Sequence, residues 1–411
     1  MLFKRIYVFL PCMPKRLLKH IFHRDHFIIV ASAFLMLGLL RVITFNLSFL
    51  DPVAMAFENF SVTDIFFDID HAAGEPETND LITLVDMTEL HSRGDIAYLL
   101  EEIWLQDPLC IGVDLIFEGE KDDPMGNEML ETAVTNLEER AVFAEKLTNY
   151  DSRHNKFTGN VRSFFSDRVA LQEGYSNLND NLAASCIRDF SIRQKGPDGT
   201  HLSFPAQIAA RYDESVAEWD NDEVLINFRN VRFPVVPYNE VADMSGLING
   251  HVVLVGTMTE EQDMHSTPLG KMSGLELQAY SLLTLLEHKG IREIPSWANW
   301  LIAFLLCYLL ELTLDIPYQL IVRKRRSVVC VFLKESNVIN LLMLFLWAAL
   351  VCWLMYLLFI RKSISLSGGL FLILLTLVCE SRELFRSLIK GLRAKYAAAR
   401  FVETSIIHEN D

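Results

Sequence analysis

Four apolar runs constrain this chain more than any other feature of its sequence. One lies near the N-terminus, at 27–45, and three crowd into the last quarter, at 297–314, 338–360 and 364–380. Each run is close to the roughly 20 residues that an α-helix needs to cross a bilayer. About 250 residues between the first two runs have the composition of a water-soluble domain. The sequence therefore predicts an α-helical membrane part of four transmembrane helices and one large domain outside the bilayer.

Charge is distributed as unevenly as hydrophobicity. The segment 46–295 holds 44 of the 53 acidic residues and 17 of the 37 lysines and arginines, so it carries −27. The flanks hold 20 basic and 9 acidic residues and carry +11. Because positively charged loops stay in the cytoplasm, we expect a basic cytoplasmic N-terminus at 1–26, a basic cytoplasmic loop at 315–337 and a cytoplasmic tail helix at 381–411. The alternative is that the first run is a cleavable signal peptide.

Composition narrows the classes of partner and site. An acidic domain argues against nucleic acid as a partner, because phosphates are bound by lysine and arginine. The segment 46–295 has only two cysteines, Cys110 and Cys186. Cys110 begins an apolar strand and is expected to be buried. A disulfide between the two cysteines is one alternative that the sequence leaves open. No CxxC motif occurs, which argues against a structural zinc site.

The first half of the outer domain alternates between strand and helix patterns. Short apolar runs at 81–86, 110–117 and 141–144 read as buried strands, and the stretches 95–105 and 125–140 have helical spacing. This order predicts an α/β domain with a largely parallel sheet flanked by helices.

In the remainder of the domain, the sequence signals for secondary structure are clear near the C-terminal end and weaker in the middle. A strand is predicted at 252–256, a long loop at 257–272 and a helix at 273–288. In the middle, 161–170 and 184–193 resemble antiparallel strands, 203–212 a helix and 224–228 a strand, whereas 46–80 is expected to be irregular.

Acidic side chains follow the predicted strands. Asp86 ends the first strand, Asp114 lies towards the end of the second, and the loop after 252–256 carries Asp263 and His265. Because parallel sheets bind ligands outside the carboxyl ends of their strands, we expect an acidic, histidine-containing ligand site formed by Asp86, Asp114, Asp263, His265 and Thr267. The alternative is that Asp86 and Asp114 bond to backbone amides, that Thr267 fixes the loop path and that the loop acids are solvated. Carboxylates could also hold a divalent cation, but the sequence predicts no metal and no cofactor.

Sequence motifs of known enzyme classes are missing. The chain has no GxSxG, HExxH, GxxxxGK[ST] or GxGxxG motif. We therefore predict no enzymatic activity, with a cryptic enzyme that uses Asp86, Asp114 and Asp263 as the least favoured alternative.

Charged residues also flank the later apolar runs. Glu311 and Asp315 end the second run and Glu380 ends the fourth, where we expect headgroups and water to satisfy them. The tail that follows has helix-forming composition. Its predicted contacts with a partner or with lipid are Leu384, Leu388 and Leu392 on one side, with Arg386 and Lys390 beside them.

Several short motifs, taken in order, resemble a known family. They are Leu84 to Asp86, Ile111 to Phe117, Gly250 to Gly256, Asp263 with Thr267 to Gly270, and Gly274 to Ala279. In sequence, spacing and membrane layout they look like a bacterial CHASE domain of the second type. That name denotes an extracellular sensory domain associated with cyclases and histidine kinases. Family members often carry a long cytoplasmic output domain, whereas only about thirty residues follow Val378 here, so we expect no fused output domain.

The resemblance implies a multi-pass protein of the bacterial inner membrane with its large domain in the periplasm. Such a protein would detect an unknown periplasmic ligand and signal to a separate cytoplasmic or membrane partner. The sequence is also compatible with a homo-oligomer of this chain. The alternative function is a membrane scaffold or assembly component whose outer domain binds a protein.

Overall fold

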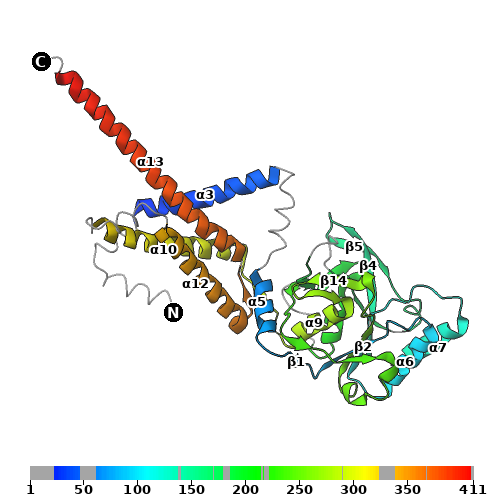
Figure 1. The fold of residues 1–411 in the computed structure, drawn as a ribbon. Helices are drawn as coiled ribbons and strands as arrows, with labels where there is room; N and C mark the ends of the chain where they lie inside the picture. Colours follow the sequence, from blue (N-terminus) through cyan, green and yellow to red (C-terminus); the bar gives the residue numbers. More distant parts are fainter. Residues whose placement is uncertain are drawn as a thin grey trace. The chain divides into compact units, whose positions relative to one another are not determined.

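The structure, a computed structural model, divides into two compact units (Figure 1). We call Thr63–Arg292 the α/β unit, and Met1–Val62 together with Glu293–Asp411 the helical unit. The residues that the structure describes are 23–46, 62–137, 140–169, 171–178, 186–213, 216, 222–288, 290–323, 338–366 and 368–408.

A seven-stranded sheet forms the centre of the α/β unit. Its order is β12-β2-β13-β3-β4-β5, and β6 also pairs with β4. The β4–β5 pair is antiparallel and the other five pairs are parallel. The strands are β2 (Ile82–Asp86), β3 (Cys110–Val113), β4 (Ala141–Asp151), β5 (Lys156–Val161), β6 (Gln172–Tyr175), β12 (Val235–Pro237) and β13 (Val252–Gly256).

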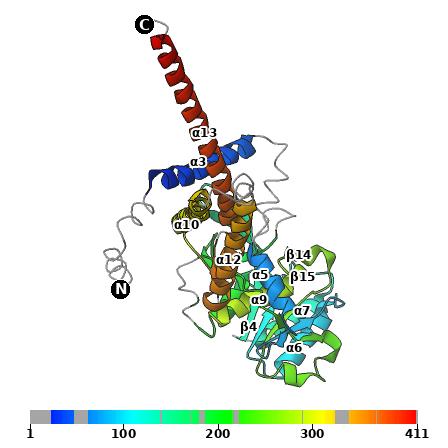
Figure 2. The same cartoon turned by 60° about the vertical axis from the view of Figure 1, so that its left-hand side comes forward.

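Helices cover the sheet because its strands are apolar on both faces. Ile111 and Val113 of β3 share a buried core with α6 (Arg93–Trp104) and α7 (Pro124–Leu137). Gly112, between them, faces α8 (Phe204–Ala209): a Cβ there would lie 2.7 Å from Ile208 Cδ1. Helix α9 (Gly274–Leu286) packs beside α8. Figure 2 shows these helices around the strands. The predicted α/β domain with a sheet flanked by helices is confirmed.

The weaker sequence signals gave some wrong elements. The predicted strand 161–170 is wrong over residues 162–169, because β5 ends at Val161 and turns follow, in which Phe165 is fully buried. Residues 62–72, expected to be irregular, form α5 (Val62–Ala72). The predicted loop 257–272 contains an antiparallel hairpin of β14 (Met264–Thr267) and β15 (Gly270–Ser273).

Smaller elements complete the described chain. They are β1 (Glu77–Thr78), β7 (Asp189–Ser191), β8 (Arg193–Gly196), β9 (Gly199–Leu202), β10 (Glu223–Leu225), β11 (Val231–Arg232), β16 (Arg292–Glu293), β17 (Ile364–Ser365) and the 3-10 helices η5 (Tyr238–Glu240), η6 (Ser245–Leu247) and η7 (Glu261–Asp263).

Cys110 is fully buried at the start of β3, as predicted. Both Cys110 and Cys186 are free thiols, so the disulfide that the sequence left open does not form.

In the part of the helical unit that the structure describes, the long helices are α3 (Arg24–Asn46), α10 (Ser296–Arg323), α12 (Val338–Lys362) and α13 (Gly368–His408). Among the described residues, two stretches are long and apolar enough to cross a bilayer, Ser296–Leu314 and Asn340–Lys362. The predicted span 27–45 lies within α3. The predicted span 364–380 begins at β17 and continues into α13 from Gly368 on, and both spans stay predictions.

Glu311 in α10 corrects one expectation. Its side chain is buried by the protein and lies 3.3 Å from both Arg382 of α13 and His26 of α3. Protein groups therefore satisfy it, and the expectation of water and headgroups is wrong for this residue.

Candidate ligand site at the carboxyl edge of the sheet

Parallel pairing brings the first two acidic residues to one edge of the sheet. Asp86 is the last residue of β2 and Asp114 directly follows β3, with β13 between these strands. Side chains alternate along a strand. Because Val85 and Val113 point into the core under α6 and α7, Asp86 and Asp114 lie on the opposite face, towards α9.

Asp114 lies in the electrostatic field of the hairpin that follows β13. Burial raises the pKa of Asp114 to about 7; the negative charge of Asp263 adds to the rise and His265 opposes it. His265 Nε2 lies 3.4 Å from Asp263 Oδ1. Three of the predicted residues therefore form one cluster, which we call the edge cluster: Asp114, Asp263 and His265.

Asp263 is held at the beginning of α9. A Cβ on Gly274, the first residue of that helix, would lie 2.5 Å from Asp263 Oδ1, so only glycine leaves room for the carboxylate. Ser273 caps the helix by accepting a hydrogen bond of 3.2 Å from the Glu276 amide. The positive end of the helix dipole stabilises a carboxylate at this place. Asp263 thus has a structural role besides its proximity to Asp114.

The other two predicted residues are engaged in local turns. Asp86 Oδ1 accepts hydrogen bonds from the Thr88 amide (3.0 Å) and the Thr88 hydroxyl (2.5 Å). The Thr267 hydroxyl donates to the Gly270 carbonyl at 2.8 Å and accepts from the Leu269 amide at 3.2 Å. Asp86 thereby shapes the loop after β2, and Thr267 closes the turn between β14 and β15. The ligand-binding role of all five residues stays a prediction.

Comparison with known proteins agrees with this architecture. The model of the CHASE2 domain family matches residues 30–313, more than half of the chain. The chain belongs to the CHASE2 family. CHASE2 domains are extracellular sensory domains, so the resemblance seen in the sequence motifs is confirmed. No curated protein and no solved structure matches the chain.

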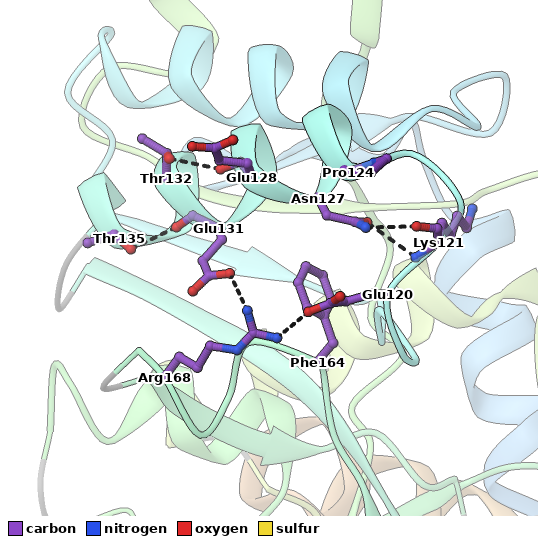
Figure 3. A pocket seen from close by; sticks show the side chains of 10 residues that line it. All are labelled: Glu120, Lys121, Pro124, Asn127, Glu128, Glu131, Thr132, Thr135, Phe164 and Arg168. Carbon is purple, nitrogen blue, oxygen red and sulfur yellow. Dashed lines mark hydrogen bonds and ion pairs between the residues drawn. The ribbon is translucent and has the colours of Figure 1, made fainter.

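The CHASE2 domain also has a polar groove that sequence reasoning missed. Its volume is about 550 Å³, and it lies between α7, the loop after β3 and the turns after β5 (Figure 3). Arg168 spans it with ion pairs to Glu120 (2.5 Å) and Glu131 (2.9 Å). The sequence signal was weak, because the lining residues of α7 look like the solvated side of an amphipathic helix.

A buried polar cluster joins the far part of the CHASE2 sheet to the β8–β9 hairpin. Glu145 of β4 lies 2.6 Å from His201 Nδ1 and accepts a hydrogen bond of 3.2 Å from Asn160. Beside it, Glu173 of β6 accepts hydrogen bonds from Arg162 (2.7 Å, from Nε) and Ser166 (2.6 Å). The sequence offered no local signal, because each partner is at least seven residues away along the chain.

The predicted tail contacts lie on a part of α13 in which no described side chain is buried. Leu384, Leu388 and Leu392 are 61%, 62% and 47% exposed, at helical spacing along one side. Arg386 is half-buried and Lys390 is exposed. The stripe is therefore accessible, as contact with a partner or with lipid requires.

Proposed function

We propose that this chain is a multi-pass sensor of a bacterial inner membrane. Its CHASE2 domain would lie in the periplasm, detect a small molecule or stimulus there, and signal through the transmembrane helices to a separate partner protein. The observation that carries this proposal is the match to a family of extracellular sensory domains over residues 30–313. The chain itself is proposed to have no enzymatic activity.

The membrane arrangement supports the proposal. Helix α3 precedes the α/β unit, and α10, α12 and α13 follow it. Two of these helices contain stretches apolar enough to span a bilayer, and the basic flanks orient all four predicted spans with both termini inside. An acidic domain between such spans belongs on the outer side.

The edge cluster is the proposed sensing site. Asp114 and Asp263 present two carboxylates beside the imidazole of His265, at the edge of the sheet where parallel α/β domains bind ligands. Carboxylates favour ligands that bring positive charge or hydrogen-bond donors. A small polar or cationic molecule is therefore the proposed class of ligand, with no metal or cofactor required.

The exposed stripe of α13 is the proposed output. Leucines four residues apart form one side of a helix and suit packing against another helix. Arg386 and Lys390, which flank the stripe, would set the register of that contact or touch anionic lipid.

Affinity capture from native membranes tests both ends of this proposal. The full-length chain should recover a partner protein and a small molecule, both identified by mass spectrometry. Replacing Leu384, Leu388 and Leu392 by serine should abolish recovery of the partner, whereas the control Ser387→Ala, at an exposed position of the same helix outside the stripe, should retain it. Replacing Asp114 and Asp263 by asparagine should lose the small molecule and retain the partner.

Three outcomes would contradict the proposal. Unchanged recovery of the partner by the serine variant would move the output elsewhere. Capture of a periplasmic protein in place of a small molecule would favour the scaffold function. Turnover by the purified chain alone, as a kinase, cyclase or hydrolase, would refute the absence of activity.

A further inference from the structure

Three ionisable side chains meet inside the helical unit, each from a different helix. Glu311 of α10 is 2% exposed, Arg382 of α13 is 1% exposed and His26 of α3 is 6% exposed. Arg382 Nη1 lies 3.3 Å from both Glu311 Oε2 and the Glu311 carbonyl oxygen. Glu311 Oε1, on its other side, lies 3.3 Å from His26 Nδ1. We call these residues the charge triad.

The charge triad fixes the three helices at one level. His26 is near the start of α3, whereas Glu311 is about 22 Å along α10 and Arg382 about 21 Å along α13, at 1.5 Å per residue. Because the charge triad joins one point on each helix, a shift of α13 by one helical turn would separate Arg382 from Glu311.

Arg382 is also the last buried residue of α13. None of the side chains described after it, at 383–392 and 395, is buried. Beyond this point α13 extends past the other helices of the unit and presents the leucine stripe (Figure 2). Ser381, the residue before it, contacts Met36 of α3 through a hydroxyl–sulfur distance of 3.3 Å. The position of the exposed tail is thus decided at Arg382.

Buried charges are costly to a folded protein, and a single unpaired one is worse than a matched pair. An apolar side chain at each position would pack without that cost. The best-attested use of such residues is to select one register among several, because a displaced charge would be left unpaired.

We propose that the charge triad is a register lock, which holds α13, and with it the exposed tail, in one position against α3 and α10. This proposal does not rest on the proposed sensory function.

Two native cysteines report on the lock. Cys307 lies one helical turn before Glu311 and Cys379 one turn before Arg382, so each cysteine is on the same side of its helix as the residue of the ion pair. In full-length protein with the other five cysteines replaced by serine, iodine, an oxidant that enters the bilayer, should link Cys307 to Cys379 as a disulfide. After cleavage at a protease site inserted in 324–337, only linked chains keep both fragments together.

The role of charge is tested by replacing charged side chains with neutral side chains of similar length. Arg382→Gln and Glu311→Gln should each lower the linked fraction at least fivefold, because each change removes the ion pair between α10 and α13. Arg382→Lys keeps the charge and should stay within twofold of the wild type. Glu380→Gln, an exposed acid on the same helix, should have no effect and serves as the matched control.

The proposal is overturned if Arg382→Gln and Arg382→Lys behave alike, whether both link normally or both lose the link. Failure of the sensory function would appear separately, as a wrong membrane orientation or as absence of ligand and partner, with the linking pattern unchanged.

Discussion

Replacing Asp114 by asparagine should stabilise the protein at alkaline pH and leave it unchanged at acid pH. Burial raises the pKa of Asp114 from 3.8 to about 7 in the folded state, with Asp263 adding to the rise and His265 opposing it. Asparagine is nearly the same size as the protonated acid and carries no charge. The variant therefore mimics the form of Asp114 that the fold favours.

The pH window follows from the two pKa values. Below about pH 4 both the folded and the unfolded chain hold the proton, so the stabilising contribution is fully present. As the pH rises towards about 7, the unfolded chain releases the proton while the folded chain keeps it, and the contribution is progressively lost. Above pH 7 the folded chain carries the buried charge at a constant cost.

The magnitude is bounded by the same values. A difference of about three pKa units, at about 1.4 kcal/mol each, gives at most about 4 kcal/mol. Because water still reaches part of the Asp114 side chain, we expect about 2 kcal/mol at pH 8. For a unit of this size that corresponds to a rise in Tm of about 4–8 °C.

Thermal unfolding of the full-length protein in detergent at pH 3, 5.5 and 8 measures this. The Tm difference between Asp114→Asn and the wild type should be near zero at pH 3, where both the folded and the unfolded chain hold the proton, and should grow to pH 8. Asp86→Asn is the matched control, because its remaining Oδ1 can still accept from Thr88, and it should leave the pH dependence in place. An Asp114→Asn protein that gains no stability at pH 8, or gains equally at all three values, would refute the reasoning.

Two further substitutions test the packing around the sheet. Glu145→Ala should lower the free energy of unfolding by about 3 kcal/mol, because His201 and Asn160 lose a buried partner; denaturant unfolding that shows under 1 kcal/mol would contradict this. Gly274→Ala should cost about 1–3 kcal/mol by displacing the Asp263 carboxylate. The same change in an Asp263→Ala background should cost little, and equal costs in both backgrounds would show that the two residues do not interact.

Sequence patterns predicted the parts of the fold that local apolar runs determine. The strands β2, β3 and β13 are short runs of buried aliphatic residues, and α6, α7 and α9 have helical spacing. The pattern failed at β5, because the partly buried Phe164 and the fully buried Phe165 extend apolar character past the end of the strand.

The candidate site, like the fold, was predicted by the sequence only in part. Parallel strands place Asp114 near the loop after β13, so the proximity of Asp114, Asp263 and His265 followed from the order of elements. Whether Asp86 and Thr267 face a ligand or a turn depends on hydrogen bonds over two or three residues, and both alternatives were consistent with the sequence. The Glu145–His201 and Glu311–Arg382 pairs join residues 56 and 71 positions apart, which no local pattern reveals.

The central claim is that the CHASE2 domain faces the periplasm, and reporter fusions test it most directly. Alkaline phosphatase, which is active only outside the cytoplasm, should be active when fused after Pro295 and inactive when fused after Arg326. The expected difference comes from the basic residues at 323–326, because positively charged loops are retained in the cytoplasm. Activity after Arg326 together with inactivity after Pro295 would place the acidic domain in the cytoplasm and contradict the account.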